Sequence, residues 1–206
     1  MYADLYLVPI SLNEFREMVK LLNYWKIDLV AIDVISSKLS LNEAKRVARE
    51  NGVEILSRVT CNATTRREVL ECIHRWARSV DLIAVRPLAA EAARVAARDS
   101  RVKIVSMDPS MARYMDRSQA TLLRQGGGVI ELVMDSFIKG SRLSARRLRS
   151  FMIIARRAAA FKVNLIVSSG AKTRWDLWHP RVVAGLLIAM GLPETIALSS
   201  MLRRAI

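Results

Sequence analysis

The chain has 206 residues, of which 52% are apolar, and a formal net charge of +14. A chain of this length and apolar content can bury a sizeable core, which excludes a disordered basic tail as a description of the whole. Its only cysteines, Cys61 and Cys72, are too few for a secreted disulfide scaffold, so we expect two buried thiols in a cytoplasmic protein. The N-terminus has no signal-peptide pattern and the longest apolar run is about half a membrane span, so we expect no membrane association.

Short apolar segments alternate with longer amphipathic ones along the whole chain. The short segments, rich in Val, Ile and Leu, predict strands at residues 3–8, 29–34, 54–61, 82–86, 103–107, 129–134 and 164–168. The longer ones predict helices at residues 12–25, 41–51, 64–78, 88–99, 118–125, 144–162, 179–190 and 194–204. This alternation is typical of a parallel sheet, and no glycine-rich phosphate loop follows the first strand. We therefore expect a single α/β domain over residues 1–206, a TIM-barrel-like fold with about seven parallel strands and an irregular eighth position.

Positive charge is concentrated in the second half of the chain. Residues 1–100 contain 15 basic and 13 acidic side chains, whereas residues 101–206 contain 18 basic and 6 acidic ones. Residues 136–175 include ten Lys or Arg and no carboxylate. Such a stretch repels itself unless an anion lies against it, and the polyanion that we expect is nucleic acid.

The predicted helix at residues 144–162 gathers arginines on one side. At about 100° per residue, Arg146, Arg149, Arg156 and Arg157 share one arc of the helix, and Arg142 joins them if the helical turn extends back to it. The opposite side is apolar and is expected to pack on the sheet. Ile153 lies inside the arginine arc, where we expect it to be exposed and available to a protein partner.

The loop after the last predicted strand interleaves basic and aromatic side chains. An indole that stacks on an unpaired base, beside cations that hold phosphates, is typical of RNA binding. The alternative is that the tryptophans anchor the loop in the core. The predicted RNA-binding residues are Arg86, Lys139, Arg142, Arg146, Arg149, Arg156, Arg157, Lys172 and Arg174. The candidates for contact with a protein partner are Ile153, Trp175 and Trp178.

The chain offers little for catalysis of its own. Asp33, Asp108 and Asp135 follow predicted strands, where barrel enzymes carry their active sites, but each is more simply a turn or capping residue. The two histidines form no pair with zinc-ligand spacing: His74 lies within a helix, and His179 is expected to cap one. We therefore predict no catalytic residue, no metal site and no cofactor bound by the protein.

Three segments carry a family resemblance: Asp-Leu-Ile-Ala-Val-Arg-Pro at residues 81–87, Val-Lys-Ile-Val-Ser-Met-Asp at 102–108 and Leu-Ile-Val-Ser-Ser-Gly-Ala at 165–171. In their order and spacing the chain resembles the p30 subunit of archaeal and eukaryotic ribonuclease P. The resemblance implies a TIM-barrel-like fold related to the metal-dependent (PHP) phosphoesterases but without their histidine ligands. This chain departs from the family pattern in its last loop, where Trp178 and Val182 occupy positions that usually carry Arg and Asp.

The resemblance also implies a function. Ribonuclease P removes the 5′ leader of precursor tRNA, and in archaea its catalytic centre is an RNA that binds Mg²⁺. The resemblance implies that this chain pairs with a small RRM-like protein, assembles with the other archaeal ribonuclease P proteins and supports the catalytic RNA. From the arginines of the basic helix we expect this support to consist of neutralising RNA phosphates. Two alternatives stay open: a free-standing metal-dependent phosphoesterase, and a protein-interaction scaffold with a basic face.

Overall fold

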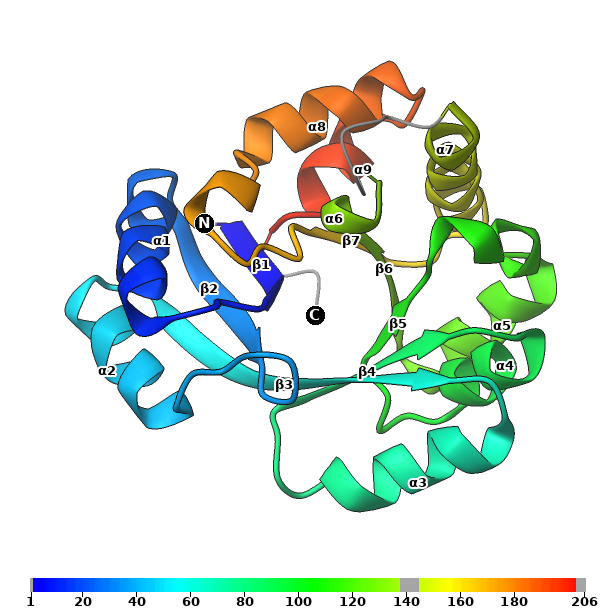
Figure 1. Cartoon of the computed structure of the whole chain (residues 1–206). Helices are drawn as coiled ribbons and strands as arrows, with labels where there is room; N and C mark the ends of the chain where they lie inside the picture. The colour runs from blue at the N-terminus through cyan, green and yellow to red at the C-terminus, as the bar shows by residue number, and fades with distance from the viewer. Residues whose placement is uncertain (1, 138–144, 203–206) are drawn as a thin grey trace.

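Seven parallel strands curve into a barrel in the computed structural model, which describes residues 2–137 and 145–202 (Figure 1). The strands are β1 (Tyr2–Leu7), β2 (Ile27–Asp33), β3 (Glu54–Ala63), β4 (Leu82–Pro87), β5 (Ile104–Ser106), β6 (Val129–Val133) and β7 (Leu165–Ser168). Each strand pairs with the next one in chain order. The TIM-barrel-like fold with seven strands is therefore confirmed.

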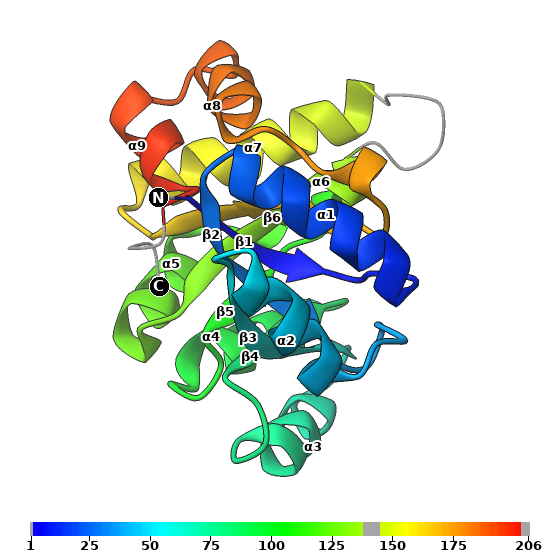
Figure 2. The same ribbon diagram turned by 90° about the vertical axis from the view of Figure 1, so that its left-hand side faces the viewer.

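Helices surround the ring of strands on the outside (Figures 1 and 2). All eight predicted helices are present: α1 (Leu12–Tyr24), α2 (Leu41–Glu50), α3 (Arg66–Trp76), α4 (Ala90–Arg98), α5 (Arg117–Gly126), α7 (Ala145–Ala160), α8 (Pro180–Ala189) and α9 (Glu194–Ser199). Three short elements were not predicted: η1 (Pro109–Tyr114), α6 (Met134–Phe137) and η2 (Arg174–Asp176). Within the described residues, no helix combines the length and apolarity needed to cross a membrane.

At the carboxyl ends of the strands, the segment after β7 closes the barrel against β1. The Val8 N–H donates to the Ala171 carbonyl at 2.8 Å, and the Gly170 N–H donates to the Tyr6 carbonyl at 3.0 Å. Gly170 has φ of +71°, and a Cβ there would lie 2.7 Å from the Val133 side chain. Only glycine fits this close approach, so the residue is required for closure.

At the amino ends of the strands, residues 200–202 fill the space between β1 and β7. The Ala3 N–H donates to the Met201 carbonyl at 2.8 Å, and the Val167 N–H donates to the Ser200 carbonyl at 3.1 Å. This segment thus forms hydrogen bonds with both β1 and β7 but is not itself a β-strand. It occupies the irregular eighth position that the sequence predicts.

A buried carboxyl group lies at the same seam. Asp4 is 6% exposed, and its Oδ1 accepts hydrogen bonds from the Ser169 N–H at 3.0 Å and the Tyr6 N–H at 3.3 Å. Burial raises the pKa of Asp4 to about 6, although these hydrogen bonds act to lower it. The carboxyl group therefore binds its proton more tightly in the folded chain than in the unfolded one.

The barrel interior contains a buried ion pair. Arg58 and Glu131, both 0% exposed, form a bidentate pair with two N···O distances of 2.6 Å. The guanidinium also donates to the Leu5 carbonyl at 2.6 Å, and Ser168 donates to Glu131 at 2.7 Å. Burial acts to raise the pKa of Glu131, but the charge and hydrogen bonds of Arg58 keep it below its ordinary value. The pair links β3 to β6 across the interior.

The two cysteines form a disulfide, so the prediction of two buried thiols is wrong. Cys61 lies near the end of β3 and Cys72 on the core-facing side of α3, with their Cα atoms 6.3 Å apart. Because α3 packs back along the strand that precedes it, residues 11 positions apart in the sequence meet in space. The bond fastens α3 to the barrel wall.

Candidate nucleic-acid interface

A basic groove of about 680 Å³ lies between η1 and α7. From the η1 side it is lined by Asp108, Pro109, Ser110, Ala112 and Arg113, and from α7 by Arg146, Arg147, Ser150, Ile153 and Arg157. Four guanidinium groups face one carboxylate, a balance of +3 (four minus one). A concave surface with this excess of arginine is suited to phosphate groups.

Two of the four arginines are held by backbone carbonyls. The Arg147 Nη1 donates to the Ser136 carbonyl at 3.0 Å, at the end of α6. The Arg157 Nη1 donates to the carbonyls of Ala112 at 3.2 Å and Met115 at 3.4 Å, which fastens α7 to η1. These arginines therefore form a fixed wall of the groove.

The other two arginines reach toward solvent. Arg113 and Arg146 are exposed, and the Arg113 guanidinium lies 4.6 Å from the centre of the Tyr114 ring. In residues 2–137 and 145–202, no carboxylate forms an ion pair with either one. Arg113 was not predicted as a site residue because it lies in η1, which has no periodic pattern and only a turn signal, Asp-Pro, at its start.

The remaining arginines of α7 have different surroundings. Arg149 is exposed but does not line the groove. The Arg156 Nε donates to the Met190 carbonyl at 2.8 Å and covers Gly191, so it caps α8. Arg156 and Arg157 thus have structural partners inside the chain, and their contact with RNA stays a prediction.

Ile153 is not the exposed residue that the helix wheel suggests. It is half-buried and packs against the hydrophobic core, because η1 covers that part of α7. It therefore belongs to the lining of the groove. The predicted RNA-binding residues Lys139 and Arg142 lie outside the part of the chain that the structure describes.

The loop after β7 presents one tryptophan and buries part of the other. Trp175 is 81% exposed, and the Arg174 guanidinium lies 4.8 Å from the centre of its ring. The Arg174 N–H donates to Glu14 of α1 at 2.6 Å, so the turn is held in place. Lys172 is exposed beside it, whereas Trp178 is half-buried against the core and anchors the loop.

Two of the three candidate acids at the mouth of the barrel accept hydrogen bonds from the turns that follow them. The Asp33 Oδ1 accepts from the Ser36 N–H at 2.9 Å, and the Asp108 Oδ1 accepts from the Ser110 N–H at 2.9 Å. Arg86 lies inside the mouth, with its guanidinium 5.7 Å from the centre of the Tyr6 ring. In the described part of the chain, no three Asp, Glu, His or Cys side chains come close enough to hold a metal ion.

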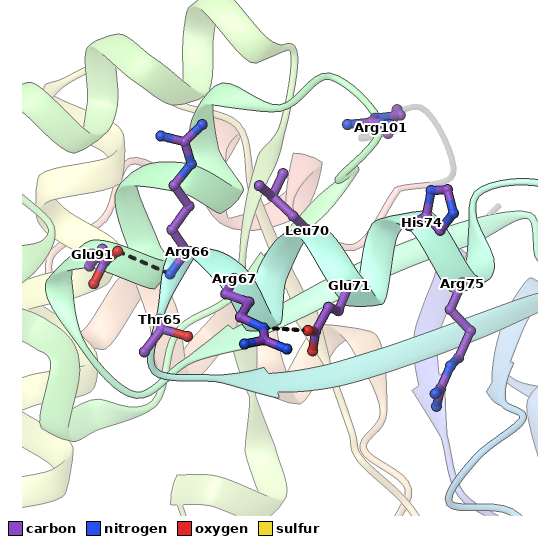
Figure 3. Close-up of a pocket in the computed structure, with 9 residues that line it drawn as sticks. All are labelled: Thr65, Arg66, Arg67, Leu70, Glu71, His74, Arg75, Glu91 and Arg101. Carbon is purple, nitrogen blue, oxygen red and sulfur yellow. Dashed lines mark hydrogen bonds and ion pairs between the residues drawn. The ribbon is translucent and has the colours of Figure 1, made fainter.

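A second groove, of about 930 Å³, runs along α3 on another side of the barrel (Figure 3). Two of its four arginines form ion pairs with carboxylates: Arg67 pairs with Glu71 at 2.7 Å, and Arg101 pairs with Asp99 at 2.7 Å. His74 lies exposed at its edge. Although this groove is larger, the one between η1 and α7 has the greater excess of positive charge and is the stronger candidate for an anion.

Comparison with known proteins places these features in a family context. The family model of RNase P subunit p30 matches residues 1–205. Ribonuclease P protein component 3 of Aeropyrum pernix is 34% identical over 137 residues, which are 66% of this chain and 64% of that protein, slightly less than two thirds of its length. A chain in the solved structure of archaeal ribonuclease P with mature tRNA superposes with a TM-score of 0.78 over 94% of this chain and 86% of that one. Its sequence is 18% identical, so this likeness supports the fold.

Proposed function

The chain belongs to the ribonuclease P subunit p30 family, and on this premise we propose that it is a protein subunit of ribonuclease P. The observation that carries the proposal is the match of the family model to residues 1–205. The curated relative has the same assignment by name, and the chain of similar fold is part of an archaeal ribonuclease P with bound tRNA. In this role the chain takes part in removing the 5′ leader of precursor tRNA.

The groove between η1 and α7 supplies positive charge to the complex. Arg113 and Arg146 are exposed there without carboxylate partners among the described residues, so each is available to a phosphate group. Neutralising packed phosphates lowers the concentration of Mg²⁺ that a folded RNA requires. Arg149 extends this charge along α7, and Lys172 adds a further cation at the loop after β7.

The chemistry of cleavage belongs, in this proposal, to the RNA and the Mg²⁺ that it binds. The protein's contribution, in the same proposal, is electrostatic support from its arginines, while Asp33 and Asp108 at the barrel mouth each use Oδ1 to accept a hydrogen bond from the turn that follows. Its protein partners are a small RRM-like subunit and the other archaeal ribonuclease P proteins, in the cytoplasm. Trp175, which is 81% exposed on a turn held by α1, is the strongest candidate for a contact with one of them.

Reconstitution tests this proposal directly. Cleavage of a precursor tRNA by the cognate RNA is measured across a Mg²⁺ titration, with and without this chain and its small partner. We expect the pair to lower the Mg²⁺ midpoint and neither protein to cut without the RNA. Arg113→Glu combined with Arg146→Glu should abolish the shift, whereas Arg98→Glu, at an exposed position of α4, should leave it in place.

Two results would contradict the proposal in different ways. Cleavage by this chain alone, in the presence of Mn²⁺ or Zn²⁺, would support a free-standing phosphoesterase instead. An unchanged Mg²⁺ midpoint with the wild-type pair would mean that the chain does not support the RNA, whatever else its basic groove binds.

A further inference from the structure

We propose that the groove between η1 and α7 is a pocket for one unpaired guanine nucleotide of an RNA, with the base inside and its phosphates on the exposed arginines. This inference rests on the proposed function, because it assumes that the anion in the groove is RNA. It adds a preference for one base to a surface that would otherwise bind phosphates without regard to sequence.

The groove has the lining of a nucleotide pocket rather than of a simple phosphate strip. Its buried and half-buried members include Pro109, Ala112 and Ile153, so part of its lining is apolar. Apolar side chains suit the face of a base, whereas a phosphate requires hydrogen-bond donors. The volume of about 680 Å³ leaves room for a nucleotide and one neighbouring phosphate.

The single carboxylate of the groove supplies the selectivity. Asp108 accepts the Ser110 N–H with Oδ1, and in the described chain its Oδ2 accepts no hydrogen bond. A carboxylate can accept two parallel hydrogen bonds on its outer edge. Guanine is the base whose Watson–Crick edge presents two adjacent donors, N1–H and the 2-amino group, so it matches a carboxylate best. Adenine, cytosine and uracil each place an acceptor where the second donor is needed.

The arginines divide into a fixed and an adaptable pair, as such a pocket requires. Arg147 is tied to the Ser136 carbonyl of α6, and Arg157 is tied to the Ala112 carbonyl of η1, so Arg157 holds α7 against η1. Arg113 and Arg146 are exposed and can close on the phosphates at either side of the base. The arginines around Asp108 therefore attract the phosphates of RNA, while the Asp108 carboxylate disfavours bases that present a hydrogen-bond acceptor to it.

Binding of short oligoribonucleotides to the full chain tests the pocket. Fluorescence anisotropy at fixed salt compares labelled heptamers with G, inosine, A or U at the centre of a uridine background. A bidentate contact to one base predicts roughly tenfold tighter binding of the G heptamer than of the U heptamer. Inosine lacks the 2-amino group and should fall between them.

Asp108→Asn is the decisive variant. Asn retains the capping of η1, so the fold is preserved, but it replaces one acceptor by a donor. The preference for G should fall to within about twofold, because the paired acceptor is gone. Arg146→Ala should weaken all four heptamers alike, and Glu43→Gln, exposed on α2, should change nothing.

The outcomes separate this inference from the proposed function. Equal binding of all four heptamers by the wild type, or a G preference that survives in Asp108→Asn, would overturn the guanine pocket. If the Mg²⁺ shift in reconstituted cleavage still depends on Arg113 and Arg146, the proposed function stands without it. If neither assay responds to these two arginines, both the pocket and the basic groove as an RNA contact are wrong.

Discussion

Removing the two exposed charges of the basic groove should change how salt affects RNA binding. Of the four arginines that line the groove in the described part of the chain, Arg147 and Arg157 are engaged by backbone carbonyls, whereas Arg113 and Arg146 are exposed and can move onto phosphates. In Arg113→Gln/Arg146→Gln the number of neutralised phosphates should fall by two. For single-stranded RNA each phosphate contributes about 0.7 to the slope of log K against log salt, so the slope should fall by about 1.4.

This change in slope is large enough to measure. When salt rises from about 50 to 200 mM, a slope difference of about 1.4 means that the wild type should lose roughly seven times more affinity for RNA than the double variant does. Titration of a labelled unstructured RNA at four salt concentrations gives both slopes. The matched control is Arg16→Gln/Arg98→Gln, which removes the same charge from exposed positions of α1 and α4. An equal fall in slope in the control would refute the reasoning, because the charge would then act from the whole surface.

Three further predictions concern stability. The Cys61–Cys72 disulfide closes a short loop, with a sequence separation of 11. Its reduction should lower the free energy of unfolding by about 3 kcal/mol and Tm by about 6–12 °C. Calorimetry with and without reductant measures this, and an unchanged Tm would contradict it. The pKa of Asp4 rises from 3.8 to about 6 on folding, so the folded state keeps a proton that the unfolded state has lost, and stability falls as pH rises through this window. Asp4→Asn should therefore be more stable than wild type by up to about 3 kcal/mol at pH 8 and equal to it near pH 3.5, as urea unfolding at both values will show. Arg58→Ala leaves Glu131 buried without its partner, so the free energy of unfolding in urea should fall by about 3–5 kcal/mol. A fall of less than about 1 kcal/mol would mean that the Glu131 carboxylate finds other hydrogen-bond donors.

The order of strands and helices could be predicted because each element is long enough to show its period. Buried parallel strands appear as unbroken apolar runs, and the helices alternate apolar and polar sides. The short η1 could not be found this way, because a 3-10 helix of six residues is too short to show a periodic pattern of apolar residues. That element matters most for the site, since it forms one wall of the basic groove and contributes Arg113.

The positive charge of α7 could be predicted from the sequence, but the sequence did not show which of its arginines bond within the chain and which are exposed. A helix wheel gives the side on which a residue lies and does not say which neighbouring element covers that side. Arg156 is engaged by the end of α8, Arg157 by η1, and Ile153 is half-covered for the same reason. The disulfide escaped prediction on similar grounds, because the distance between Cys61 and Cys72 depends on how α3 returns along β3.

The way in which the barrel is closed has a consequence for how the chain folds. The amino end of β1 bonds to Met201, a residue 198 positions away, and its carboxyl end bonds to Ala171. During synthesis from the N-terminus, β1 can pair with β2 early, but its other edge stays unpaired until the segments around Ala171 and Met201 have been made. An open strand edge is a site of wrong pairing and aggregation. The segments around Ala171 and Met201 therefore act as a late latch, because the barrel stays open along one edge of β1 until both have folded against it.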